Sequence, residues 1–271
     1  MTREPDHARA TRWMRGVRAS WRELTGGTGV ADELRPTLIA VSGGADSAAV
    51  AIALATLDAA RVVIGTVLHD QRPAELVHDD RVAVEGLARV LGVPCCVAHA
   101  GTAVGNAEHK ARASRYRALE RMARGHGCSF VATGHHAWDQ AETLLMAIVR
   151  GGSPRSLLGV RRSRPMDGLG ATVVRPALEL EPSGASDVCN AFGYTPRRDA
   201  TNLDWSRSRA RLRRLVVPEL AATTKDLGSM LRRTTERLAE AIDASVSEKR
   251  TNVGNNGVEP SDIADGIETE H

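Results

Sequence analysis

The sequence contains no long apolar run and few aromatic residues. None of its apolar stretches approaches the ~20 residues that a membrane-spanning helix needs, and the amino terminus is charged without an apolar signal core. We therefore expect a cytoplasmic protein that has no membrane partner. Aromatic residues make up only 3% of the chain, but 42% of the residues are hydrophobic, so a core built from aliphatic side chains is available.

Cysteine is also scarce, and its spacing does not suit metal binding. The four cysteines are Cys95, Cys96, Cys128 and Cys189, and none of them forms a Cys-x-x-Cys pair. This spacing gives no support for a zinc site, an iron–sulfur cluster or a disulfide framework. Small buried apolar side chains are the better interpretation of these residues.

The chain is organised around a glycine loop between an apolar run and a helix-forming run. Residues 38–41 are typical of a short buried strand, and the Ala-rich residues 48–57 favour a helix. The loop at 42–47 lacks both the Gly-Lys-Ser/Thr ending of a Walker A loop and the three-glycine spacing of a dinucleotide site. Gly43 and Gly44 can adopt positive φ angles, and the free N–H groups at the helix start attract a phosphate. The alternative is a plain glycine turn in which a loop side chain only caps the helix.

Strand-like and helix-like patterns alternate after this loop. We predict strands at 38–41, 62–68, 95–98, 128–133 and 171–175, and helices at 77–91, 107–124 and 138–149, the first of which would turn Val82, Leu87 and Leu91 inward. The alternation predicts an α/β fold with a doubly wound, mainly parallel five-stranded sheet. Ligands of such sheets bind at the carboxyl ends of the strands, where the glycine loop, His69 and residues 134–136 would meet.

The chain divides into four predicted segments. These are a helical extension at 1–35 with a helix at 11–22, a catalytic domain at 36–222, a small helical region at 223–248, and an acidic tail at 249–271. The extension could pack on the sheet or contact RNA, and the sequence does not decide between the two. Within the later part, Leu212, Leu215, Val216 and Leu220 form an apolar patch broken by Pro218, and residues 227–242 have a helical pattern. The tail has almost no core candidates, so we expect it to be disordered.

The positive charge is unevenly distributed. The net charge is only +3, but arginines crowd residues 197–237 while the tail is acidic. This asymmetry indicates nucleic-acid contact by the basic segment. For any single arginine, a solvated helix face remains the alternative.

A second motif, at residues 134–143, reads Gly-His-His-Ala-Trp-Asp-Gln-Ala-Glu-Thr. Asp139 and Glu142 are three residues apart at a helix start, so both carboxylates share one face. Beside a triphosphate they would suit Mg²⁺, which prefers oxygen ligands, and one of them could instead act as a general base or orient an amine. The plain alternative is that both acids only favour the positive helix start. A zinc pair of His135 and His136 is rejected because no third ligand lies at a suitable spacing.

The ordered motifs resemble a known family. The loop Ser-Gly-Gly-x-Asp-Ser resembles the PP-loop of the ATP pyrophosphatases, and together with the second motif it resembles the tRNA(Ile)-lysidine synthetases. Further matches are His69-Asp70-Gln71-Arg72, Glu108 with Ala111-Arg112 and Arg115-Tyr116, Arg150-Gly151-Gly152, Arg175-Pro176-Ala177-Leu178, and Asp199 to Asp204 with Arg209 and Arg213 after it. The similarity covers about residues 38–222.

The resemblance implies a Rossmann-like PP-loop ATPase fold, ATP and Mg²⁺ as cofactors, and a defined reaction. Enzymes of this family adenylate the C2 oxygen of the wobble cytidine in the CAU anticodon of tRNA(Ile), and then attach free L-lysine at C2 to form lysidine. The implied roles are as follows: catalysis by Asp46, Asp139, Glu142 and Arg209; ATP binding by Ser42, Gly43, Gly44, Ala45, Asp46, Ser47, Arg112, Gly134 and His135; tRNA or substrate binding by His69, Arg72, Arg115, Arg150 and Arg213; and Mg²⁺ binding by Asp46 and Asp139. Related enzymes can be dimeric, so a homodimer is also expected.

The sequence departs from the family pattern at a few places. Trp138 replaces the first member of a usual Asp-Asp pair, Ala210 replaces a common Asn, and Asp70-Gln71 replaces a usual Gly-Leu. The large C-terminal tRNA-binding domain of the family is not recognised in this sequence. Two alternatives stay open: another PP-loop enzyme that modifies tRNA, of which a thiolase would need paired cysteines, and an RNA-binding relic without catalysis.

Overall fold

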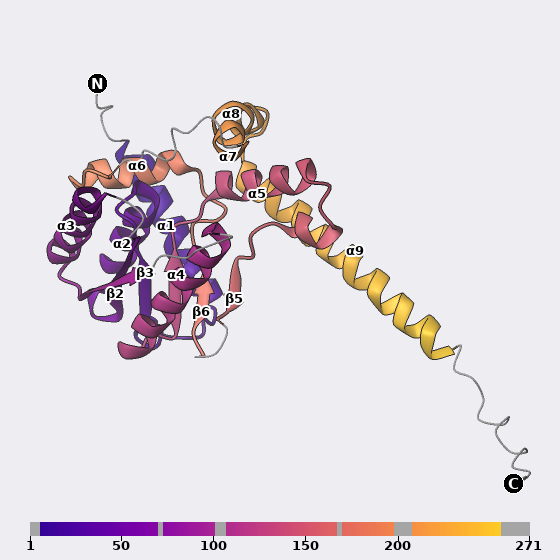
Figure 1. The fold of residues 1–271 in the computed structure, drawn as a ribbon, viewed down its shortest axis with the longest axis horizontal. Coiled ribbons are helices and arrows are strands. Elements are labelled where there is room, and N and C mark those ends of the chain that lie inside the picture. Colours follow the sequence, from indigo (N-terminus) through magenta and orange to yellow (C-terminus); the bar gives the residue numbers. More distant parts are fainter. Residues whose placement is uncertain (1–5, 70–72, 101–106, 167–169, 198–207, 256–271) are drawn as a thin grey trace, which may run out of the picture.

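The computed structural model describes residues 6–69, 73–100, 107–166, 170–197 and 208–255, and for residues 69, 107–109 and 248–255 the backbone alone (Figure 1). Its helices are α1 (His7–Leu24), α2 (Ala45–Ala55), α3 (Ala74–Leu91), α4 (Ala107–Gly125), α5 (Ala137–Val149), α6 (Pro182–Ala191), α7 (Ser208–Arg211), α8 (Val217–Ala222) and α9 (Leu227–Asn255). Its strands are β1 (Thr37–Ala40), β2 (Val62–His69), β3 (Cys95–Ala100), β4 (Phe130–Thr133), β5 (Ser163–Pro165) and β6 (Thr172–Val174). The predicted roles of Arg72, of the Asp70-Gln71 pair and of the motif at 199–204 lie outside the described residues.

The strands form one six-stranded sheet in the order β3-β2-β1-β4-β6-β5. Neighbouring strands are parallel except β5, which pairs antiparallel with β6. The α/β class and the mainly parallel sheet are therefore confirmed, but the prediction of five strands is wrong. Strand β5 was missed because Ser163, Arg164 and Pro165 carry no apolar run, and a proline is tolerated there because the strand lies at the edge of the sheet.

Alternate residues of β1 face two separate cores, as a doubly wound sheet requires. Ile39 lies in the core that contains helix α2, whereas Leu38 and Ala40 lie in the core that contains Leu119 of α4. The side chains of Leu38, Ile39 and Ala40 are each at most 2% exposed. Both faces of the sheet are thus covered by packed side chains, and the ends of the strands are left uncovered.

The strand order reverses between β1 and β4. From β1 the chain moves outward to β2 and β3, and then returns to β4 on the other side of β1. Ligands of open α/β sheets bind outside the carboxyl ends of the strands at such a point. The glycine loop follows β1 and residues 134–136 follow β4, so both motifs meet there.

Helix α1 packs on the sheet layer, as the first of the two alternatives for the N-terminal segment predicts. Trp13, Val17 and Trp21 are buried on one face of α1, in the same core as α2 and α6. The indole N–H of Trp13 donates to the carbonyl of Glu181 at 3.1 Å. Gly184 of α6 lies against Trp13, since a Cβ there would come within 2.3 Å of the indole ring.

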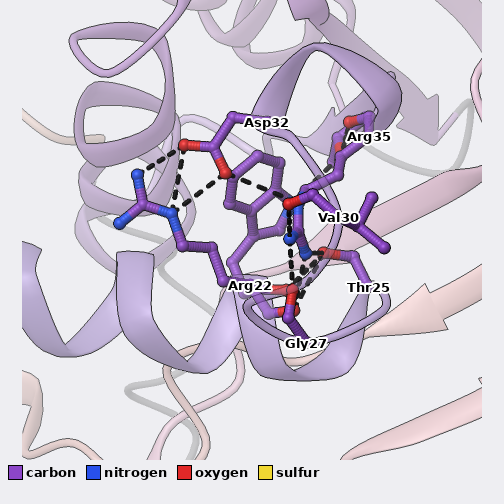
Figure 2. Close-up of polar contacts among 8 residues, drawn as sticks. Arg22, Thr25, Gly27, Val30, Asp32 and Arg35 are labelled. Atoms are coloured by element: carbon purple, nitrogen blue, oxygen red, sulfur yellow. Dashed lines mark hydrogen bonds and ion pairs between the residues drawn. The ribbon is translucent and has the colours of Figure 1, made fainter.

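A buried arginine joins α1 to the start of the sheet (Figure 2). The side chain of Arg35 is fully buried, with 0% exposure. Its Nη1 donates to the Arg22 carbonyl and to the Thr25 hydroxyl, each at 2.6 Å, and its Nη2 donates to the carbonyls of Gly27 and Val30. The guanidinium therefore adds donors to carbonyls at and after the end of α1, where helical N–H partners run out.

Two details of helix packing differ from the prediction. In α3, Leu87 is buried and Leu91 packs against the core as predicted, but Val82 is 53% exposed and the fully buried Val84 lies inward in its place. Pro218 does not interrupt the helical backbone, because the π-helical segment Leu212–Val216 continues directly into α8. There, Leu215 and Val216 are 53% and 40% exposed, whereas Val217 is buried.

Helix α9 begins on α5 and then extends away from the sheet layer (Figure 1). Leu227 and Leu231 pack with Ala141 of α5 and Val217 of α8 in a third small core. The helix continues to Asn255, so the predicted end at 242 and the predicted disorder over 249–255 are wrong. Within the described ranges, no helix is both long and apolar enough to cross a membrane.

Candidate active site

The glycine loop is held in shape by its own serines and by one left-handed glycine. Gly43 has φ +86°, a conformation that favours glycine, whereas Gly44 has φ −74° and serves as the N-cap of α2. The hydroxyl of Ser47 accepts from the Ser42 N–H at 3.1 Å and donates to the Gly44 carbonyl at 3.2 Å. Only one of the two glycines predicted to use positive φ does so.

The carbonyl of Gly43 is fixed from outside the loop. It accepts hydrogen bonds from the Tyr194 hydroxyl at 3.0 Å and from the Arg197 N–H at 2.9 Å. The Arg197 guanidinium in turn contacts Asp79 at 3.0 Å and Asp80 at 3.4 Å on α3. The segment after α6 therefore connects the loop to α3.

Gly134 brings the second motif into direct contact with the loop. A Cβ at this position would lie 2.6 Å from the backbone N of Ser47 and 2.8 Å from the carbonyl carbon of Asp46. Glycine is required here for close approach rather than for an unusual φ angle. Next to it, the Nδ1 of His135 lies 2.8 Å from the Thr133 hydroxyl, and burial lowers the pKa of His135 to about 3. The imidazole of His135 is therefore neutral at physiological pH.

His136 lies between the two aspartates predicted for the site. Its Nε2 is 3.6 Å from Asp46 Oδ2 and 3.5 Å from Asp139 Oδ2. Burial works to lower the pKa of His136, but the interaction with Asp46 and the charge of Asp139 outweigh it, so the pKa is raised. Burial likewise opposes ionisation of Asp139, but the positive charges of His136 and Arg213 hold its pKa below the usual range.

Two arginines from the segment after residue 207 pair with the carboxylates of α5. Arg213 Nε contacts Glu142 Oε2 at 2.8 Å and its Nη2 contacts Asp139 Oδ1, while Arg209 Nε contacts Glu142 Oε1. The carboxylate of Glu142 is only 3% exposed, so its charge needs these partners. Arg213 belongs to the π-helical segment, a feature that is frequent at functional sites.

These groups line a cavity of about 720 Å³. Its lining contains His135, Asp139, Glu142, Thr143, Gly159, Val160, Ala210 and the arginines Arg112, Arg161, Arg164, Arg175, Arg209 and Arg213. Guanidinium groups dominate this lining and only two carboxylates accompany them, so the cavity suits a ligand with several negative charges.

The structure gathers most of the predicted site residues but not all of them. Gly134 contacts the loop, Asp46 approaches Asp139 through His136, and Asp139, Glu142, Arg209 and Arg213 line one cavity together with Arg112 and His135. Arg115 is half-buried on α4 and does not line this cavity, and Arg150 is exposed just after α5. The side chain of His69 is not among those described.

Several residues of the site were not predicted. His136 was considered only as a zinc ligand, and Arg164 and Arg161 belong to a stretch with no motif. Arg175 was recognised within a motif but without a role. The position of His136 in the second motif, between Gly134 and Asp139, is a signal in the sequence that could have identified it. The contribution of Arg164 depends on strand β5, which was not predicted.

Trp138 does not take the place of a carboxylate in the cavity. Its ring packs on the small core of α5, α8 and α9, and its indole N–H donates to Glu181 Oε2 at 2.7 Å. It is absent from the described lining of the cavity. The side chain at position 138 in this chain thus connects α5 to the segment before α6.

The cysteines are poorly placed for sulfur chemistry. Cys128 and Cys189 are buried, and burial raises the pKa of Cys96 and of Cys128 to about 11 and that of Cys189 to about 12. A thiol with such a pKa is rarely in its nucleophilic thiolate form. In the part of the chain that the structure describes, no three His, Cys, Asp or Glu side chains cluster as metal ligands.

Comparisons with known proteins agree with this geometry. A family model described as a PP-loop domain matches residues 21–220. The tRNA(Ile)-lysidine synthase of Salinispora tropica is 36% identical over 234 residues, which are 84% of this chain and 68% of the relative. That of Salinispora arenicola is 37% identical over 80% of this chain and 66% of its own length. That of Bacillus cereus is 36% identical over 68% of this chain and 40% of its own length. The chain therefore spans about two thirds of the Salinispora relatives and less than half of the Bacillus relative.

A solved structure supports the fold. The U34-tRNA thiolase NcsA from Methanococcus maripaludis, with its [4Fe-4S] cluster, matches with a TM-score of 0.69 and 16% identity, over 87% of this chain and 81% of that chain. At this identity the likeness concerns the fold alone. The PP-loop model and the identity to curated relatives together establish the family: the chain belongs to the PP-loop proteins and, within them, to the tRNA(Ile)-lysidine synthase family.

Proposed function

We propose that the chain joins L-lysine to the wobble cytidine of an isoleucine tRNA with a CAU anticodon, using ATP and forming lysidine. The observation that carries this proposal is the meeting of the two motifs: Asp46 of the glycine loop and Asp139 of α5 lie on either side of one imidazole. A phosphate cradle next to paired carboxylates is what adenylation followed by attack of an amine requires. The cytidine must be splayed out of the anticodon loop to reach this point.

The reaction proceeds in two steps at the same cytosine carbon. The C2 oxygen attacks the α-phosphorus of ATP and pyrophosphate leaves, which converts a poor leaving oxygen into a good one. The ε-amine of lysine then attacks C2, loses a proton and expels AMP. The β and γ phosphates lie on the glycine loop, where the N–H groups and the dipole of α2 favour negative charge.

The residues present fit a magnesium ion. Asp46 and Asp139 each bring a hard carboxylate oxygen to within 3.6 Å of the same imidazole nitrogen, and Mg²⁺ is commonly held by one or two carboxylates together with phosphates. When bound, the ion would neutralise phosphate charge as the pyrophosphate leaves. When His136 is protonated, which its raised pKa favours, its positive charge limits the mutual repulsion of the two aspartates.

The carboxylates of α5 are better suited to hold the lysine ammonium than to remove its proton. The pKa of Asp139 is held below its usual range, so its carboxylate is a weak base at neutral pH. Glu142 is already paired with Arg209 and Arg213. We infer that a bound ammonium shares these carboxylates with the arginines, which then turn toward the AMP phosphate.

One assay tests the proposal directly. The full chain is incubated with a CAU-anticodon isoleucine tRNA, ATP and L-lysine, and the wobble nucleoside is analysed by mass spectrometry after digestion. We expect the lysidine mass only when all three reactants are present, and no product from Asp139→Asn. The matched control is Asp243→Asn, an exposed position on α9. No lysidine at saturating substrates, or a thiolated nucleoside instead, would refute the proposal.

Two further parts of the proposal concern the compartment in which the chain acts and its oligomeric state. We propose that it acts in the cytoplasm, where its tRNA substrate is modified. A homodimer remains a prediction, and sedimentation of the full chain with and without tRNA tests it.

A further inference from the structure

Three arginines surround one tyrosine beside the candidate active site. The Arg112 guanidinium lies 5.3 Å from the ring centroid of Tyr116 and the Arg164 guanidinium lies 4.8 Å from it. The third, Arg175, reaches the Tyr116 hydroxyl with its Nη2 at 3.5 Å. We call Arg112, Arg164 and Arg175 around Tyr116 the arginine cluster; its members come from α4, β5 and the residue after β6.

The positive charges of the arginine cluster have no acidic partner in the described structure. Among the residues that the structure covers, no ion pair joins any of the three guanidinium groups to a carboxylate. Arg175 is 2% exposed, its Nη1 donates to the Arg161 carbonyl at 2.6 Å, and its Nε has no hydrogen-bond partner. A buried guanidinium with an unused N–H beside like charges is costly unless an anion joins it.

The arginine cluster faces the reaction site. Arg112, Arg164 and Arg175 all line the cavity of about 720 Å³ that also contains His135 and Asp139. Arg112 and Arg164 additionally line an adjoining cavity of about 360 Å³ together with Tyr116 and Glu120. Arg112 and Arg164 therefore border both the reaction site and a second cavity.

The anion that the arginine cluster takes is separate from the phosphates on the glycine loop. The loop has its own N–H donors and a helix start for those phosphates, and no loop residue lines the described cavities beside the cluster. Guanidinium groups fixed by an aromatic ring suit a phosphodiester, because their planar N–H pairs bind phosphate oxygens in bidentate fashion.

We propose that the arginine cluster binds a backbone phosphate of the RNA next to the nucleotide that is modified, and that Tyr116 positions its guanidinium groups. This inference rests on the function proposed above and assigns Arg112 to the RNA rather than to ATP, where the sequence motif had put it. The base attached to that phosphate has the adjoining cavity available to it, where it can stack on a guanidinium plane.

The test variant is Arg164→Gln; Arg164 is half-buried on the edge strand, so its replacement should leave the fold intact. The matched control is Arg124→Gln, which replaces an exposed arginine at the end of α4. The dissociation constant for the tRNA is measured from 50 to 200 mM salt, in steps chosen to give a slope. Steady-state kinetics supply separate KM values for tRNA, ATP and lysine. A second variant, Tyr116→Leu, removes the ring and keeps all three charges.

We expect Arg164→Gln to raise the Kd and the KM for tRNA about tenfold and to reduce the salt slope by about 0.7. The KM for ATP should stay within twofold, and Tyr116→Leu should weaken tRNA binding with an unchanged salt slope. An unchanged tRNA Kd and slope in Arg164→Gln overturns the inference. A rise in the KM for ATP alone also overturns it, because the cluster would then serve the ATP phosphates.

These results are separable from a failure of the proposed function. If wild-type protein binds tRNA but forms no lysidine, the reaction proposed above is wrong, while the Kd and salt slope still decide whether the cluster binds RNA. If lysidine forms normally and Arg164→Gln behaves like Arg124→Gln, the reaction stands and the inference is wrong.

Discussion

Replacement of Gly134 by alanine tests the contact between the two motifs. The added Cβ would lie 2.6 Å from the Ser47 backbone N, whereas ordinary contacts begin at 3.4 Å, so the loop and the second motif must separate by about 0.8 Å. The atoms that the added Cβ would approach belong to the backbone of Asp46 and Ser47. Backbone atoms cannot rotate away as a flexible side chain would. A misplacement of about 1 Å in a catalytic arrangement costs roughly 100-fold in rate. We therefore expect kcat/KM for lysidine formation to fall about 100-fold in Gly134→Ala.

The control is Gly86→Ala in α3, where an added Cβ meets no atom within 4 Å. Alanine in an exposed helix position stabilises by about 0.5–1 kcal/mol over glycine, so this variant should keep full activity and unfold at slightly higher temperature. Pyrophosphate release and wobble-nucleoside mass are measured for both variants, with thermal unfolding in parallel. A folded Gly134→Ala protein with kcat/KM within threefold of wild type would refute the claim that the two motifs touch.

Three other predictions concern stability, pH and charge. Arg35→Met removes the guanidinium that donates to three carbonyls and pairs with Asp32, and it should lower the free energy of unfolding by about 3–5 kcal/mol in urea titration. The control Arg12→Met, at an exposed position, should change the free energy of unfolding by no more than about 0.5 kcal/mol. Equal effects of the two substitutions would contradict the structural role of Arg35. The raised pKa of His136 means that its contribution is complete below the ordinary value of 6.5 and disappears as the pH rises through the raised pKa. The stability difference between wild type and His136→Gln should therefore shrink with rising pH, and a constant difference would disprove this linkage. Glu142→Gln should lower kcat/KM for lysine roughly 10–100-fold with tRNA affinity unchanged, while exposed Glu219→Gln should have no effect.

The regular part of the fold was predictable because local patterns and tertiary structure agree there. The residues of β1 after Thr37 are apolar, and all four of its residues are buried, so their pattern identifies a parallel strand covered on both faces. Strand β5 contains Arg164 and Pro165 and exists only because β6 offers it an edge. In α3 the prediction placed Val82 rather than Val84 in the core, because the two are equally apolar and only the packing decides which one is buried.

The site was predictable where a motif contains all of its parts, and not where the parts come from different segments. Asp139 and Glu142 lie on one helical turn, so their proximity follows from spacing. Their pairing with Arg213 depends on how a distant π-helical segment returns to α5, which no local pattern contains. The charge state of His136 likewise depends on Asp46, which precedes it by 90 residues in the sequence.

The packing of α1 bears on where a self-sufficient folding unit begins. The matched family model starts at residue 21, near the end of α1, so a fragment cut to its bounds would lack Trp13 and Val17. Both side chains are at most 5% exposed, and each contributes about 1.5–3 kcal/mol by its burial. Such a fragment would expose the faces of α2 and α6 that they cover, and would lose a large share of a typical stability of about 5–15 kcal/mol. The bounds of the family model and those of the packed folding unit thus differ in this protein, and fragments for expression should follow the second.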